Sequence, residues 1–384
     1  MFDTPAPHAL TLSGAQIVTP TGIRDGALRV EDGKIAGIGA DHGEGRDLAG
    51  HYLIPGIVDL HTDHIERHVF PRLTVQWPFL PALLAHDAVI IAGGTTTVFD
   101  SLSVGASLKR PERREILGPL IDALEHGRAA GAFRADHMLH LRCEISDPTT
   151  MELVDDNIGR DITRLVSVMD HTPGDRQLPD IERWFDHMLK DMAVTTDEGR
   201  TMMAELLDRS ARVGAQVRTH VIATAHAHAH TIMSHDDRSV AHVDQARAEG
   251  IAISEFPCTL TAARHARNSG MLNVAGAPNY LRGGSQSGNV GVAALLADDL
   301  VDALASDYIP RSPLDAAFAI AADPGLPHDL PAALALVTAA PARMAGLLDR
   351  GRIAVGLRAD LVAVRLIAGQ PIVSAAWRAG HQVF

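Results

Sequence analysis

Cysteine is scarce in this sequence, since Cys143 and Cys258 are the only two among 384 residues. Two cysteines are too few for the disulfide framework of a small secreted protein, and they suit a reducing compartment. Long apolar runs are also missing, because no segment approaches the roughly 18 apolar residues that a membrane-spanning helix requires. The first residues carry no basic stretch of the kind that begins a secretion signal. The sequence therefore predicts a cytoplasmic protein that does not contact a membrane.

Basic residues are too few to balance the acidic ones. The chain has 34 lysines and arginines against 47 acidic residues, a formal net charge of −13. Nucleic acids and anionic membranes are bound chiefly through basic surfaces, so neither is expected as a partner. An anionic small molecule would bind only where a metal ion or a few local arginines overcome this charge. Hydrophobic residues make up 46% of the chain, enough for the large core of a globular enzyme.

Short apolar segments that read as strands recur through the middle of the chain. Eight of them cover residues 57–63, 95–100, 138–144, 165–171, 231–235, 251–256, 272–277 and 304–307. Helix-like segments lie between them, and residues 111–130 have the 3.6-residue apolar repeat of an amphipathic helix. Eight strands alternating with helices over about 250 residues predict an α/β fold, a (β/α)₈ TIM-like barrel.

Both ends of the chain have a different pattern from the middle. Residues 9–54 and the segment after residue 351 contain short strands separated by turns. The two ends are therefore expected to pair into one small β-sandwich domain, formed by residues 1–54 and 346–384. Residues 55–345 are then left as the barrel. A homodimer is the default expectation, because dimers are the commonest oligomers of soluble proteins.

Strong metal ligands follow several of the predicted barrel strands. The predicted strand at residues 57–63 carries His61 and Asp63 at its end, and later predicted strands also end in a histidine or a carboxylate. In a barrel the carboxyl ends of all strands lie at one face, so these side chains are expected to converge there. Each also has an ordinary alternative, such as an ion pair with Arg142 or a helix cap. The residues concerned are His61, Asp63, Glu144, His171, His235 and Asp307.

A mixed shell of histidines and carboxylates suits Zn²⁺, with Mn²⁺ as the alternative, and either one or two ions. Such ions lower the pKa of water enough to supply hydroxide near neutral pH, so hydrolysis is the predicted chemistry. Asp307 ends the last strand and is the candidate for proton transfer. As a helix cap near Pro310, Asp307 would instead have only a structural role.

A glycine-rich and serine-rich loop follows the seventh predicted strand. Backbone N–H groups in such a loop can turn toward an anion, and an arginine can bind two phosphate oxygens at once. The loop is expected to bind a phosphate of the substrate, as loops after the last strands of barrels often do. A plain flexible loop is the alternative. The predicted substrate contacts are Arg282, Gly283, Gly284, Ser285 and Ser287.

These residues together resemble the amidohydrolase superfamily and, within it, the PhnM family of the carbon–phosphorus lyase pathway. The resemblance covers nearly the whole chain and is carried by residues 61–68 (HTDHIERH), 96–101, 140–146, 168–173, 234–237, 282–285 and 306–310. It implies a diphosphatase of phosphonate catabolism that hydrolyses α-D-ribose 1-methylphosphonate 5-triphosphate to the 5-phosphate and diphosphate.

The resemblance also implies roles for single residues. His61, Asp63, Glu144, His171 and His235 would bind the metal, Asp307 would transfer the proton, and Arg176 would contact the substrate. This sequence departs from the family pattern at His64, Asp175 and Gln286, where the family has Asn, Gln and His. These departures leave the ligand set intact and bear on contacts with the substrate.

Two other functions compete with this interpretation. The same metal chemistry would serve an amidohydrolase that cleaves a C–N bond, such as a cyclic-amide hydrolase or a nucleobase deaminase. The Arg282 loop argues for a phosphorylated substrate instead, because a neutral ring does not require an anion site. A metal-free assembly subunit would have lost ligands, and none of the expected ones is missing.

Overall fold

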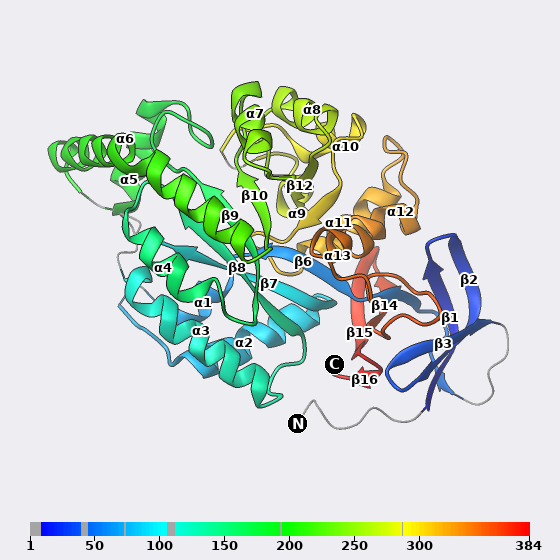
Figure 1. The fold of residues 1–384 in the computed structure, drawn as a ribbon. Helices are drawn as coiled ribbons and strands as arrows, with labels where there is room; N and C mark the ends of the chain where they lie inside the picture. The colour runs from blue at the N-terminus through cyan, green and yellow to red at the C-terminus, as the bar shows by residue number, and fades with distance from the viewer. Residues whose placement is uncertain (1–8, 40–44, 73, 106–111, 193, 286) are drawn as a thin grey trace.

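The structure is a computed structural model that describes residues 9–39, 45–72, 74–105, 112–192, 194–285 and 287–384. Its strands form two sheets of eight strands each. Figure 1 shows the barrel sheet surrounded by helices and, on one side, a separate sheet built from both ends of the chain. The predicted (β/α)₈ barrel with a β-domain from both chain ends is therefore confirmed.

The barrel strands pair in parallel and in chain order from β6 to β13. The sheet closes where the loop after β13 meets β6: Asp307 N–H donates to the His61 carbonyl at 2.9 Å, and Asp63 N–H donates to the Asp307 carbonyl at 3.0 Å. Closure thus brings three of the predicted site residues to one seam. The strands are β6 Ile57–Thr62, β7 Thr95–Val104, β8 Asp136–Glu144, β9 Thr163–Met169, β10 Thr231–His235, β11 Ile253–Glu255, β12 Leu272–Gly276 and β13 Ala303–Ala305.

Burial on both faces explains why these strands are rich in apolar residues. Every residue of β6 is buried, and one face of it packs Val58 and Leu60 inside the barrel against Phe99 and Met233. The opposite faces of the strands pack against the surrounding helices in the largest apolar cluster. The candidate site lies at the carboxyl ends of these strands, the face at which barrel enzymes carry their active sites.

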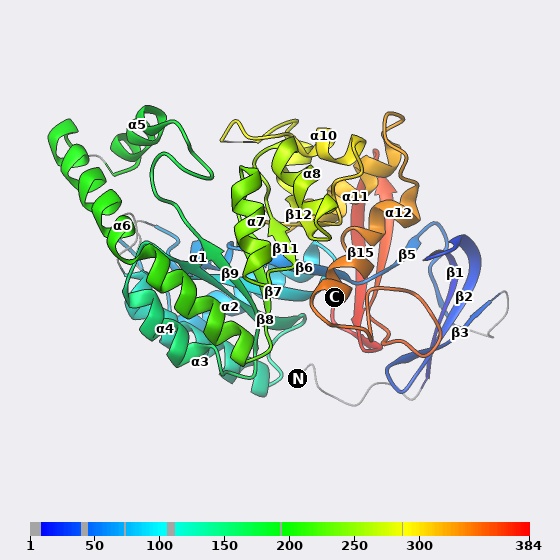
Figure 2. The same cartoon turned by 45° about the horizontal axis from the view of Figure 1, so that its top comes forward.

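The helices cover the outside of the barrel. The longest helix, α6, starts with a capping box in which Thr195 and Glu198 satisfy each other's backbone N–H groups. In Figures 1 and 2, α5 and α6 lie on the side of the molecule opposite β1 to β3. The helices are α1 Ile65–Val69, α2 Phe79–Ala92, α3 Arg113–Ala129, α4 Thr149–Asn157, α5 Ile181–Met192, α6 Thr196–Ala227, α7 Val240–Ala248, α8 Leu260–Asn268, α9 Ala277–Leu281, α10 Val292–Ala297, α11 Ser312–Ala322, α12 Leu330–Ala335 and α13 Ala339–Met344.

The second sheet joins the two ends of the chain through β5 and β14, which pair antiparallel from Tyr52 to Pro55. Its order is β16-β15-β14-β5-β1-β2-β3, with β4 beside β1. In the described part of the chain, no helix is long and apolar enough to cross a membrane. The strands are β1 Ala9–Thr19, β2 Gly22–Glu31, β3 Lys34–Gly39, β4 Arg46–Asp47, β5 Tyr52–Pro55, β14 Leu361–Ile367, β15 Gln370–Arg378 and β16 His381–Gln382.

Candidate active site

Glu255, the last residue of β11, lies between two of the predicted ligands. Its Oε1 accepts a hydrogen bond from His61 Nδ1 at 2.7 Å, and its Oε2 accepts one from His235 Nδ1 at 2.7 Å. All three side chains are buried. Because Nδ1 of His61 is committed to Glu255, its Nε2 is the free nitrogen, and this buried atom has no partner among the described residues. A histidine oriented by a carboxylate, with its second nitrogen open, is the usual arrangement of a metal ligand.

The protonation of this group also suits a cation. Burial lowers the pKa of His61 to about 4, so its imidazole is neutral at neutral pH and keeps a lone pair. Burial alone would raise the pKa of Glu255, but the adjacent His61 and His140 rings and the histidine hydrogen bonds hold it well below its usual range. Asp236 and Glu255 raise the pKa of His235 despite its burial. The site therefore combines an ionised carboxylate with neighbouring imidazoles.

A second carboxylate–histidine pair stands at the ends of β8 and β9. Glu144 Oε2 accepts a hydrogen bond from His171 Nδ1 at 2.7 Å, and its Oε1 accepts one from Ser146 Oγ at 2.8 Å. The ring of His171 lies 6.0 Å from that of His235, measured between centroids. One ligand atom from each of His171, His235 and Asp236 lies within 4.8 Å of the others. Glu144 thus orients His171 in the way that Glu255 orients His61.

Asp63 and Asp307 lie at the seam of the barrel. Burial and the charge of Asp63 raise the pKa of Asp307 to about 7. Arg142 Nη1 lies 3.7 Å from Asp63 Oδ2, so the possible ion pair of Arg142 is formed with Asp63 and not with Glu144. The helix after Asp307 begins only at Ser312, so Asp307 does not cap it.

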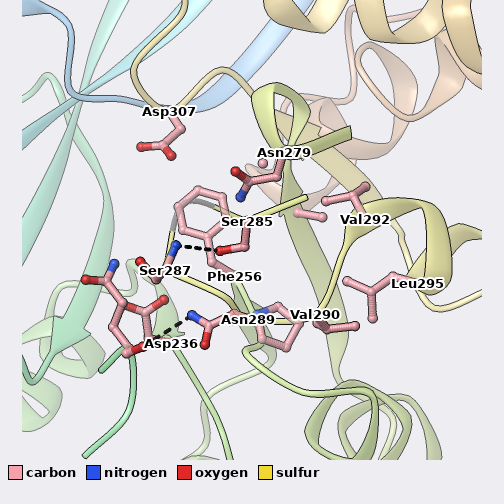
Figure 3. A pocket seen from close by; sticks show the side chains of 14 residues that line it. Asp236, Phe256, Asn279, Ser285, Ser287, Asn289, Val290, Val292, Leu295 and Asp307 are labelled. Atoms are coloured by element: carbon pink, nitrogen blue, oxygen red, sulfur yellow. Dashed lines mark hydrogen bonds between the residues drawn. The ribbon is translucent and has the colours of Figure 1, made fainter. Parts of the chain in front are cut away.

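A pocket connects Asp307 with the predicted anion loop. Figure 3 shows Asp307 and Asn279 at one end of the pocket and Asp236 and Asn289 at the other, with Ser285 and Ser287 between them. Ser287 N–H donates to Ser285 Oγ at 3.2 Å, and Asn289 Nδ2 donates to the Gln177 carbonyl at 3.3 Å. Both predicted serines therefore line the same pocket as the predicted proton acceptor.

The structure separates the other predicted substrate contacts from this pocket. Arg282 is exposed, its Nη1 donates to Tyr308 Oη at 3.3 Å, and neither it nor Gly283 or Gly284 is among the residues that line the pocket. Arg176 is buried, and its Nη1 donates to Asp237 Oδ1 at 2.9 Å and to the His235 carbonyl at 3.0 Å. Arg176 thus holds the strand end that carries His235.

Position 286 lies outside the described residues, so the departure at Gln286 has no structural account. Asp175 and His64, the other two departures, are described. Asp175 Oδ1 lies 3.2 Å from His242 Nε2, which provides a local partner for its negative charge.

Sequence reasoning missed two buried residues of the site, Glu255 and His140. Glu255 is the only carboxylate in the strand predicted at residues 251–256 and lies next to its end, and this position could have indicated it. His140 lies four residues before Glu144 on β8, its Nδ1 donates to the Leu60 carbonyl at 3.0 Å, and its Nε2 has no partner among the described residues. Its ring lies 5.3 Å from that of His61, so it is a further candidate ligand.

Comparison with known proteins places this site in a family. Residues 172–383 match the Amidohydrolase family. The chain is 37% identical to alpha-D-ribose 1-methylphosphonate 5-triphosphate diphosphatase of Escherichia coli (strain K12), over 98% of this chain and 100% of that protein. The chain belongs to the amidohydrolase family. It is accordingly a hydrolase.

Other amidohydrolases resemble this one over shorter stretches or in fold alone. A D-hydantoinase of Rhizobium radiobacter is 38% identical over 94 residues, 24% of this chain and 19% of that protein. N-acetyl-D-glucosamine-6-phosphate deacetylase of Mycobacterium smegmatis has a similar fold, with a TM-score of 0.64, 17% identity and coverage of 98% of this chain and 100% of that one. The 5-methylcytosine deaminase of Klebsiella pneumoniae gives a TM-score of 0.64, 17% identity and 98% coverage of both chains.

The residues of this amidohydrolase fit a divalent metal ion, on which members of the superfamily generally depend. The buried and unpaired Nε2 of His61 is the observation that supports the fit, because a buried nitrogen without a partner is costly. His235 and His171 supply further nitrogens at the same strand ends. The sequence prediction of a metal-dependent hydrolase is confirmed at this level.

Proposed function

We propose that this amidohydrolase hydrolyses alpha-D-ribose 1-methylphosphonate 5-triphosphate to the 5-phosphate and diphosphate. The observation that supports the proposal most is the 37% identity with the diphosphatase of that name, which extends over the full length of both proteins. A match of this extent includes the barrel, the terminal sheet and the pocket loop. The protein would act in phosphonate catabolism as a homodimer.

In this proposal His61, Asp63, Glu144, His171 and His235 hold one or two divalent ions, with Zn²⁺ preferred over Mn²⁺ because imidazoles dominate the buried positions. Glu255 fixes the tautomer of both His61 and His235. A bound ion supplies positive charge that polarises a phosphoryl oxygen and makes water more acidic.

Asp307 accepts the proton of the attacking water at its carboxylate. Its position at the seam places the side chain in the pocket beside Asp63, and a pKa near 7 suits a group that takes up and returns a proton at neutral pH. Its backbone also has a left-handed φ of 53°, a costly conformation that the seam hydrogen bonds maintain.

The loop after α9 binds the phosphate chain. Ser285 and Ser287 present hydroxyl groups to the pocket, and Arg282 on the same loop leaves its guanidinium exposed for phosphate oxygens that extend outward. Gly283 has a φ of 75° and allows the turn between them. Arg176 contributes indirectly, by holding the backbone of His235.

A second candidate function is cleavage of a C–N bond in a cyclic amide. The 94-residue match to a D-hydantoinase favours it, but that match covers about a quarter of the chain. The pocket loop and the full-length match favour the phosphoric anhydride.

The test offers the purified protein both substrate classes. Phosphorus NMR should show equal amounts of diphosphate and the 5-phosphate from the triphosphate, and dihydropyrimidines and hydantoins should remain unchanged. Asp307→Asn should lower kcat by about 10²–10⁴-fold with unchanged thermal stability, because it removes the proton acceptor and keeps the shape. Release of orthophosphate, ring opening, or a fully active Asp307→Asn protein would contradict the proposal.

A further inference from the structure

Three histidines that the active site does not use meet where α1 packs beside α2 (Figure 1). His64 directly precedes α1, His68 lies one helical turn later, and His86 lies in the middle of α2. Their ring centroids are 5.0 Å apart for His64 and His68, 5.9 Å for His64 and His86, and 5.7 Å for His68 and His86. One ring nitrogen of each lies within 4.8 Å of those of the other two.

Each of these rings has a buried nitrogen that lacks a partner. Nδ1 of His64, Nε2 of His68 and Nδ1 of His86 have no hydrogen-bond partner among the described residues. A buried polar atom is normally paired, so three unpaired nitrogens in one place indicate a ligand that satisfies them together. His86 is completely buried, which excludes solvent as a partner of its Nδ1.

A carboxylate determines which nitrogen of His86 remains open. His86 Nε2–H donates to Asp100 Oδ1 at 2.8 Å, so Nδ1 carries the lone pair. Asp100 Oδ2 accepts a second hydrogen bond from His137 Nδ1 at 2.7 Å, and His137 Nε2 lies 3.3 Å from Asp87 Oδ1. This chain of partners fixes the His86 ring as an outer-shell carboxylate fixes a metal-binding histidine.

The group is separate from the active site. The ring of His61 contacts those of His140, His235 and Phe256, whereas the ring of His64 contacts those of His68 and His86. In the sequence, Asp63 lies between His61 of the first group and His64 of the second. An ion bound by His64 would therefore also hold the connection that carries Asp63.

We propose that His64, His68 and His86 form a second metal site that binds a divalent transition-metal ion of the Zn²⁺ class. A group made of three imidazole nitrogens suits Zn²⁺, Ni²⁺ or Cu²⁺, and it suits Mg²⁺ or Ca²⁺ poorly. The ion links α1 to α2, and three protein ligands leave a coordination position free for water or a small anion.

Metal counting on the full-length protein tests this site. The protein is stripped with a chelator, reloaded with Zn²⁺ and desalted, and bound zinc is measured by mass spectrometry. His64→Asn and His68→Gln should each bind one Zn²⁺ per chain fewer than the wild type. His265→Gln removes a histidine that bonds Asp244 on the surface at 2.7 Å, so it should retain the wild-type count.

A wild-type count in both His64→Asn and His68→Gln, with native circular dichroism, would overturn the proposal. A second measurement covers the case in which the variants do not fold. In the wild type, Zn²⁺ should protect His64 and His68 from diethyl pyrocarbonate, while the exposed His126 stays reactive. Equal modification of His68 with and without Zn²⁺ would also refute the site. Because both readouts are independent of turnover, they do not depend on the proposed reaction.

Discussion

At the scale of single residues, Glu255 orients two proposed metal ligands at once. Both of its oxygens are used, one by His61 and one by His235, and the side chain is fully buried. An outer-shell carboxylate of this kind fixes the ring orientation and raises the basicity of the ligand nitrogen. We therefore expect metal binding to depend on Glu255 through the two histidines that it orients.

Replacing Glu255 with Gln should weaken metal binding by about 10–100-fold, because the amide has one acceptor where two N–H donors converge. Competition with a chromogenic chelator measures this affinity. Glu152→Gln, at an exposed side chain beside Arg114, is the matched control and should bind metal like the wild type. Equal affinity in the Glu255 variant would remove Glu255 from the metal site.

Three residues that line the pocket share a left-handed backbone conformation. Asp236, Phe256 and Asp307 follow the ends of β10, β11 and β13, and all three have φ values between 53° and 57°. Non-glycine residues in this left-handed region cost about 1–3 kcal/mol each and persist where the surrounding structure fixes them. These three residues therefore share a costly backbone conformation at the carboxyl ends of barrel strands, and all three line the pocket.

At the scale of elements, the loop between α9 and α10 determines how a phosphate would be bound. Arg238 donates to Asn289 Oδ1 and, at 3.3 Å, to the Gln177 carbonyl, which ties the far end of the loop to the segment after β9. Ser285 and Ser287 face the pocket, while Arg282 stays exposed near Tyr308. One end of the loop is therefore held in place, and at its other end the exposed Arg282 is accessible to a phosphate of the substrate.

Arg282→Ala should raise the Kd for the triphosphate substrate, because each charge-assisted hydrogen bond to phosphate contributes about 1.5–3 kcal/mol. Added salt should weaken substrate binding more in the wild type than in the variant. Arg264→Ala provides the control, since this exposed arginine pairs with Asp298 away from the pocket. Unchanged affinity together with unchanged salt dependence would leave Arg282 without a role in binding.

The elements themselves could be predicted from the sequence, whereas their contacts could not. Strands such as β6 are apolar because both faces are buried, and this pattern is visible without a structure. Glu255 bridges His61 and His235 because β6, β10 and β11 bring the three side chains together across the barrel. No local sequence pattern encodes this arrangement of the strands. The hydrogen bond from Arg176 to the His235 carbonyl joins two distant segments in the same way and could not be predicted from the sequence.

At the scale of the whole molecule, Asp136 joins the barrel to the terminal sheet. It begins β8 and meets three arginines from the last part of the chain, Arg350 at 2.8 Å, Arg358 at 2.6 Å and Arg378 at 3.1 Å. Burial would raise its pKa, but the charges of Arg358, Arg378 and Arg350 lower it to about 2. Arg350 also donates to Thr97 Oγ1 on β7, so the same cluster contacts two barrel strands.

The acid sensitivity of the fold should follow from this junction. The pKa of Asp136 falls from 3.8 to about 2 on folding, so its ionised form stabilises the protein by about 2 kcal/mol above pH 3.8. This contribution is lost as the pH falls through about 2. Asp136→Asn should therefore lower the free energy of unfolding in urea at about pH 7, and its deficit should shrink toward about pH 3.

Asp122→Asn is the control for this prediction, because Asp122 is an exposed partner of Arg160 within the barrel helices. Surface pairs of this kind contribute about 0–1 kcal/mol, so the control should stay close to the wild type at each pH. A deficit of Asp136→Asn that stays constant with pH would mean that the carboxylate charge is not what holds the sheet to the barrel. The lost stability would then come from packing and from hydrogen bonds such as those of Arg350 to Thr97 Oγ1 and of Arg378 to the Ala135 carbonyl.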